Sequence, residues 1–111
     1  MEWDYSLEDK ITDGKVAIIQ AFEVGFNKIA ITFKNSYTGQ EKILNFSRVI
    51  SLSIEADCGV HYDNDMDFMA YRTLIGFGFS KSETTHIYVM KIDDYEIEIK
   101  SLNPVSLSRS A

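Results

Sequence analysis

The stretch Lys28-Ile-Ala-Ile-Thr-Phe-Lys34 alternates large apolar residues with small or polar ones. Ile29, Ile31 and Phe33 occupy every second position, and successive side chains of a β-strand point to opposite faces of its sheet. One face of this segment is therefore apolar and the other faces solvent. The stretch predicts a half-buried strand.

The same alternation recurs from residue 15 to residue 102. Besides residues 28–34, the predicted strands cover residues 15–24, 41–46, 48–56, 73–80, 85–92 and 95–102. Short segments rich in Gly, Asn, Asp and Ser separate them, which is typical of turns. About seven antiparallel strands predict an all-β fold, or a mainly β fold with a short helix, built as an antiparallel sandwich or a curled sheet.

Two of these strands have a pattern that predicts their place in the sheet. Residues 15–24 are apolar on both faces, which favours a central or covered strand, and Gly25 marks a bulge or turn at its end. Residues 48–56 follow the hairpin of residues 28–46 at once, so we expect them to add a further hairpin partner.

The two ends of the chain have weaker patterns. Residues 1–10 and 67–72 are the places where a short helical turn is expected. We expect a single β-rich domain over residues 1–103 and a frayed, Ser-rich tail over residues 104–111.

Charge and composition exclude several functional classes. The chain has a net charge of −6 and a pI near 4.8, and no two of its Lys and Arg residues are adjacent, so direct binding to DNA or RNA is not expected. No stretch approaches the roughly 18 apolar residues that a membrane span needs, and the acidic N-terminus is unlike a secretory signal. The single cysteine, Cys58, allows no internal disulfide. We expect a cytoplasmic protein without membrane contact.

The segment Asp57-Cys-Gly-Val-His-Tyr-Asp-Asn-Asp-Met-Asp67 concentrates negative charge between two predicted strands. Its carboxylates repel one another, so the segment is either a well-solvated connection or a surface that meets a cation or a basic partner. Phe68, Met69 and Tyr71 follow it. Aromatic and methionine side chains flanked by charge are typical of protein-binding surfaces, and they are equally compatible with core residues under a loop.

Calcium is disfavoured by the positions that follow these aspartates. Asp63, Asp65 and Asp67 have the spacing that opens a helix-loop-helix calcium loop. That loop requires Gly at its sixth position and Glu at its twelfth, where this chain has Phe68 and Leu74.

Other candidate residues lack the partners that chemistry requires. His61 and His86 would have to converge to act as acid and base on a phosphodiester, and nothing in the sequence brings them together. Cys58 has neither the base of a nucleophile nor the paired spacing of a zinc site. Gly76 and Gly78 lie within a predicted strand, which favours close packing over phosphate binding.

No catalytic residue, cofactor site or metal site is predicted. The residues that we expect to contact a partner are those of the acidic segment and of the last predicted turn: Asp57, His61, Tyr62, Asp63, Asp65, Asp67, Asp93, Asp94 and Glu96.

The first half of the chain resembles small bacterial immunity proteins of contact-dependent growth inhibition. The resemblance rests on Trp3, on Asp13-Gly-Lys15, on Ile29-Ala-Ile-Thr-Phe33 and on Leu44-Asn-Phe-Ser-Arg-Val-Ile-Ser-Leu-Ser-Ile54. It implies a cytoplasmic inhibitor without catalysis or cofactor, which binds a cognate toxin domain, often a basic nuclease, and covers its active site or substrate groove. An acidic surface can occupy a nuclease cleft in place of phosphates. The alternative is a small-ligand or metal-binding β-domain that uses residues 57–67.

Overall fold

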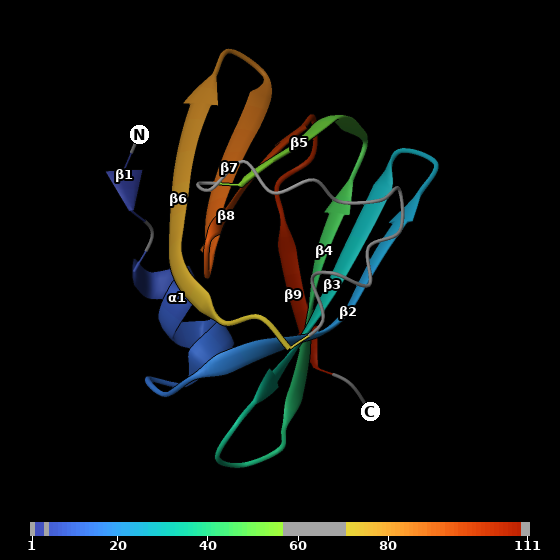
Figure 1. Cartoon of the computed structure of the whole chain (residues 1–111). Coiled ribbons are helices and arrows are strands. Elements are labelled where there is room, and N and C mark those ends of the chain that lie inside the picture. The colour runs from blue at the N-terminus through green and yellow to red at the C-terminus, as the bar shows by residue number, and fades with distance from the viewer. Residues whose placement is uncertain (1, 4, 57–70, 110–111) are drawn as a thin grey trace.

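Two antiparallel sheets pack face to face in the computed structural model, which describes residues 2–3, 5–56 and 71–109 (Figure 1). The elements are β1 (Glu2–Trp3), α1 (Tyr5–Thr12), β2 (Ala17–Gly25), β3 (Lys28–Asn35), β4 (Glu41–Ser47), β5 (Val49–Ala56), β6 (Leu74–Ser82), β7 (Thr85–Ile92), β8 (Tyr95–Ser101) and β9 (Ser106–Arg109). One sheet has the order β1-β6-β7-β8-β5 and the other β2-β3-β4-β9. The predicted mainly β fold with a short helix is confirmed.

A single apolar core lies between the two sheets. Ile31 and Leu44 of the four-stranded sheet and Phe77, Met90 and Ile97 of the five-stranded sheet are all fully buried. Burying each such side chain stabilises the fold by about 1.5–3 kcal/mol relative to leaving it exposed. The predicted inward face of β3, formed by alternate apolar residues, is part of this core.

β2 contains a bulge that resets its alternation. Its register against β3 shifts between Ile19 and Ala21, so that Phe22 is buried on the same face as Ile19. Strict alternation placed Phe22 with Val16, and that grouping is wrong because one extra residue in a strand reverses the faces of those that follow. Val16 is largely exposed instead.

β5 and β6 contain similar irregularities, between Val49 and Ser51 and between Leu74 and Gly76. In β5 the shift brings Val49 against the core and leaves Ile50 56% exposed. Strict alternation over residues 48–56 would place Ile50 on the same face as Leu52 and Ile54, and the bulge removes it from that face.

β2 lies at the edge of its sheet within the described part of the chain, so of the two expected positions, central or covered, the central one is wrong. Part of its free edge is bonded to the segment before β6. The Ile19 amide donates to the Arg72 carbonyl at 2.8 Å, and the Tyr71 amide donates to the Ile19 carbonyl at 2.8 Å. These two hydrogen bonds pair part of the free edge of β2 with the segment before β6.

β5 pairs with β8 of the opposite sheet and not with β4, so the expected hairpin is wrong. The single residue between β4 and β5 is Arg48, whose φ is 51°. The backbone in this left-handed region turns sharply, which lets the chain cross from one sheet to the other.

The C-terminal segment is also more ordered than expected. β9 pairs antiparallel with β4, with Leu107 opposite Leu44, and Leu107 packs against the core. The expectation of a frayed tail over residues 104–111 is wrong for Ser106–Arg109, since these residues complete the four-stranded sheet.

Candidate functional site

Six of the nine predicted contact residues lie outside the residues that the structure describes: Asp57, His61, Tyr62, Asp63, Asp65 and Asp67. The other three, Asp93, Asp94 and Glu96, lie together at the two-residue turn between β7 and β8 and on the first residues of β8. The predicted turn at Asp93-Asp94 is confirmed.

This turn is bonded to the segment that precedes β6. The Asp93 amide donates to the Thr73 carbonyl at 3.0 Å, and the Thr73 amide donates to Asp93 Oδ2 at 3.2 Å. Asp93 has a φ of 51°, a left-handed conformation that Asp and Asn tolerate better than most residues. Asp93 is thereby held in place, while the Asp94 side chain is exposed.

Pairing of β5 with β8 extends the negative charge over the outer face of the five-stranded sheet. Glu55 lies directly opposite Glu96, and Glu98 lies two residues further along β8. Directly opposed residues lie on the same face, where like charges repel. We call the five carboxylates Glu55, Asp93, Asp94, Glu96 and Glu98 the acidic face.

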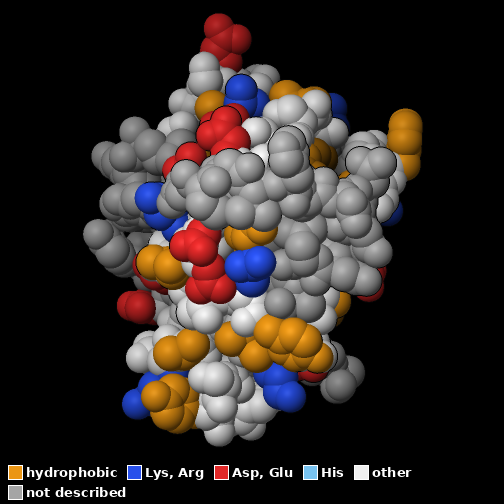
Figure 2. Space-filling view, viewed as in Figure 1, with side chains coloured by type: hydrophobic (Ala, Val, Ile, Leu, Met, Phe, Trp, Pro, Cys, Tyr) orange, Lys and Arg blue, Asp and Glu red, His pale blue; other side chains and the backbone are white. Residues whose placement is uncertain are grey.

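Two lysines moderate the charge of the acidic face. Lys91 lies opposite Glu96 on β7, and Lys100 Nζ is 3.7 Å from a carboxylate oxygen of Glu98. This last pair is exposed, and such pairs contribute little to stability. Figure 2 shows Asp and Glu side chains gathered on the viewed face of the molecule, with Lys and Arg among them.

The sequence did not reveal Glu55 as part of this group. Its position depends on the pairing of β5 with β8, which are separated by about forty residues of chain, and no local pattern encodes that pairing. Glu98 has a recognisable signal, because it follows Glu96 at the two-residue spacing that places both side chains on one face of a strand.

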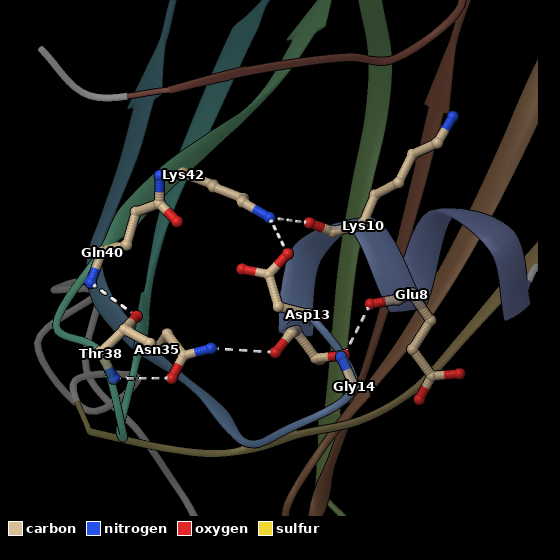
Figure 3. Close-up of polar contacts among 9 residues, drawn as sticks. Glu8, Lys10, Asp13, Gly14, Asn35, Thr38, Gln40 and Lys42 are labelled. Carbon is tan, nitrogen blue, oxygen red and sulfur yellow. Dashed lines mark hydrogen bonds and ion pairs between the residues drawn. The ribbon is translucent and has the colours of Figure 1, made fainter.

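A second polar cluster joins the end of α1 to the four-stranded sheet (Figure 3). The Lys42 ammonium donates to the Lys10 carbonyl and to Asp13 Oδ1, the latter at 2.7 Å. The Asn35 side-chain amide donates to the Thr12 carbonyl at 3.0 Å. Lys42 and Asn35 are buried and their polar groups are engaged in satisfying the last carbonyls of the helix, so the cluster is structural.

His86 lies on β7 in a row of aromatic rings. Its ring centroid is 6.0 Å from that of Phe79 and 6.3 Å from that of Tyr88. The second histidine that a phosphodiester mechanism requires, His61, lies outside the described residues. Within the described ranges, no group of three or more His, Cys, Asp or Glu side chains is placed to hold a metal ion.

Comparison with known proteins supports the fold and nothing finer. No protein-family model and no curated protein matches the chain. Among solved structures, it is similar to an uncharacterized protein from Neisseria gonorrhoeae, with a TM-score of 0.64 and 10% sequence identity, over 84% of this chain and 90% of the other.

Gly76 and Gly78 lie inside β6, as predicted, with Gly78 opposite Val89 of β7 and Trp3 of β1. A glycine between two strands lets neighbouring side chains approach closely.

The only described helix, α1, is too short to cross a bilayer.

Proposed function

We propose that the chain is an immunity-type protein that binds a cognate toxin domain, a basic nuclease, and covers its active site or substrate groove. The observation on which this proposal depends is the acidic face. Its five carboxylates lie at one end and on the outer face of the five-stranded sheet. Two lysines, Lys91 and Lys100, partly offset their charge.

The position of the acidic face suits a partner of opposite charge. A nuclease needs a positive cleft for the phosphates of its substrate, and a rigid array of carboxylates can occupy that cleft. Hairpin β7–β8 holds Asp94 and Glu96 on a regular sheet, and Asp93 is fixed by its bonds to Thr73. Little ordering entropy is then lost on binding.

The chain also leaves β5 at the same end of the sheet. Ala56 pairs with Tyr95, beside the Asp93-Asp94 turn, and the sequence continues from there into the aspartates of residues 57–67. The proposed contact surface is centred on this end.

Titration of the purified chain against the toxin domain encoded beside its gene tests the proposal. We expect a complex and protection of the nuclease's substrate, and the double variant Asp94→Lys, Glu96→Lys should weaken binding by an order of magnitude or more. The double variant Glu23→Lys, Glu83→Lys makes the same change in net charge at exposed positions on β2 and in the turn at the other end of β7, and is the control. No complex with the wild-type chain, or equal losses in both variants, would overturn the proposal.

A further inference from the structure

A hollow of about 310 Å³ opens between α1, the β6–β7 hairpin and the segment that leads into β9. Its walls include Leu7, Phe79, His86, Tyr88 and Val105, with Lys10 beside them. The size is at the lower end of the range of small-molecule sites, and the surface of the hollow is almost evenly divided between polar and apolar atoms.

The aromatic wall of this hollow is held in place from behind. The Val105 amide donates to the Tyr88 hydroxyl at 2.8 Å, and the Tyr88 ring meets the buried Phe46 ring edge-on, with centroids 5.4 Å apart. Phe79 lies 5.4 Å from Tyr88 on the neighbouring strand. The partly exposed Phe79 and His86 rings, supported by the buried Tyr88 ring, therefore form a preformed surface against which a planar group can pack without reorganisation.

The His86 ring lines the hollow, and one of its nitrogens is unsatisfied among the described residues. Its Nδ1 is buried and has no hydrogen-bond partner among the described residues. Buried side-chain nitrogens are nearly always bonded in folded proteins, so this histidine is unlike the satisfied polar groups of the Lys42 cluster.

Lys10 gives the hollow a positive charge in an otherwise acidic molecule. Figure 3 shows the Lys10 side chain pointing away from the Lys42–Asp13 pair. Its ammonium forms no ion pair with any described carboxylate, and none of the residues that line the hollow is acidic. A single ammonium beside an apolar wall suits one carboxylate better than a phosphate, which usually engages several donors.

We infer that this hollow binds a small planar aromatic carboxylate, with the ring system against Phe79 and His86 and the carboxylate at Lys10. The site is separate from the acidic face, and its occupancy does not depend on the toxin-neutralising role.

Calorimetric titration of the full chain with 2-naphthoate, and with the uncharged 2-naphthamide, tests this inference. We expect saturable binding of the carboxylate and about tenfold weaker binding of the amide, because only the former has a charge-assisted bond to Lys10. Lys10→Gln should remove that preference. Lys15→Gln is the matched control, since Lys15 lies over the Tyr37 ring, away from the hollow.

Pro104→Trp provides a second, independent variant. Pro104 is exposed and lines the hollow, so an indole there should block the site and abolish binding while circular dichroism reports an intact fold. Absence of saturable binding of 2-naphthoate to the wild-type chain would overturn the inference. Equal affinity for the acid and the amide, or equal effects of Lys10→Gln and Lys15→Gln, would overturn it as well.

Discussion

Lys42 is a buried cation on β4 whose two partners, the Lys10 carbonyl and Asp13, lie at the end of α1 and immediately after it. Its side chain is 8% exposed, whereas the side chain of its partner Asp13 is 44% exposed. Loss of the ammonium leaves Asp13 free to be solvated but leaves the Lys10 carbonyl without its donor. The cost therefore comes chiefly from lost charge-assisted hydrogen bonds and not from a stranded buried charge.

We expect Lys42→Met to lower the free energy of unfolding by about 1–3 kcal/mol. Urea denaturation followed by circular dichroism measures the change. Lys28→Met, at an exposed position at the start of β3, is the control and should shift stability by no more than about 0.5 kcal/mol. Equal shifts in the two variants would show that the Lys42 bonds contribute nothing.

Glu8 gives the fold a pH dependence of predictable sign. Partial burial raises the pKa of its carboxyl above the ordinary value of 4.5, and the nearby charge of Asp9 raises it further. An acid whose pKa is higher in the folded state than in the unfolded state binds its proton more tightly when folded. Its charge is therefore destabilising above the folded pKa, and this destabilisation is relieved as the pH falls through that value.

Glu8→Gln should accordingly be more stable than the wild-type chain at pH 7. The difference should shrink as the pH falls through the raised pKa and vanish below the ordinary value of 4.5. Thermal unfolding at several pH values measures it, with Glu83→Gln in the exposed β6–β7 turn as the control. A stability difference that stays constant from pH 7 to pH 4 would contradict the assigned cause.

At the scale of the strand, alternation located most elements but not their irregularities. The pattern in residues 28–34 and 85–92 predicted β3 and β7 because these strands contain no extra residue of their own, and the irregularities in their pairing lie in the partners β2 and β6. The bulge in β2 depends on how the partner strand packs, so the local sequence does not encode it. β9 has one apolar residue packed on the core, Leu107, and its partner β4 lies about sixty residues earlier.

The bulge in β2 itself is testable because its extra residue is exposed. Deleting Gln20 should leave a regular ladder in which Phe22 still faces the core, because Ile19, Ala21 and Phe22 keep their partners on β3. Inserting one alanine after Gln20 should instead turn Phe22 away from the core, at a cost of about 3–5 kcal/mol, the usual range for losing a buried phenylalanine. Denaturant unfolding of the two variants gives the comparison, and similar stabilities would show that the register of β2 does not place Phe22.

At the scale of the whole molecule, charge and topology act together. The sequence predicted an acidic protein with contact residues in the acidic segment and at the last turn. The grouping of Glu55 with Glu96 required the crossover that places β5 beside β8. The aromatic hollow was not predicted at all, because α1, β6, β7 and the segment before β9 come from both ends of the chain. Sites of this kind are defined by tertiary contacts, which periodicity does not encode.

The proposed association with a basic toxin domain should depend on ionic strength in its rate, because the chain has a net charge of −6. Salt screens charges beyond about 8 Å at 0.15 M, so raising it from 50 to 500 mM should slow association by roughly tenfold, with a smaller change in dissociation. Glu96→Lys should flatten this dependence more than Glu83→Lys, because both change the net charge equally and only Glu96 lies on the acidic face. Stopped-flow or surface-plasmon kinetics measure the slopes. If the two variants give the same slope, the field of the whole molecule steers the encounter and the acidic face has no special part in it.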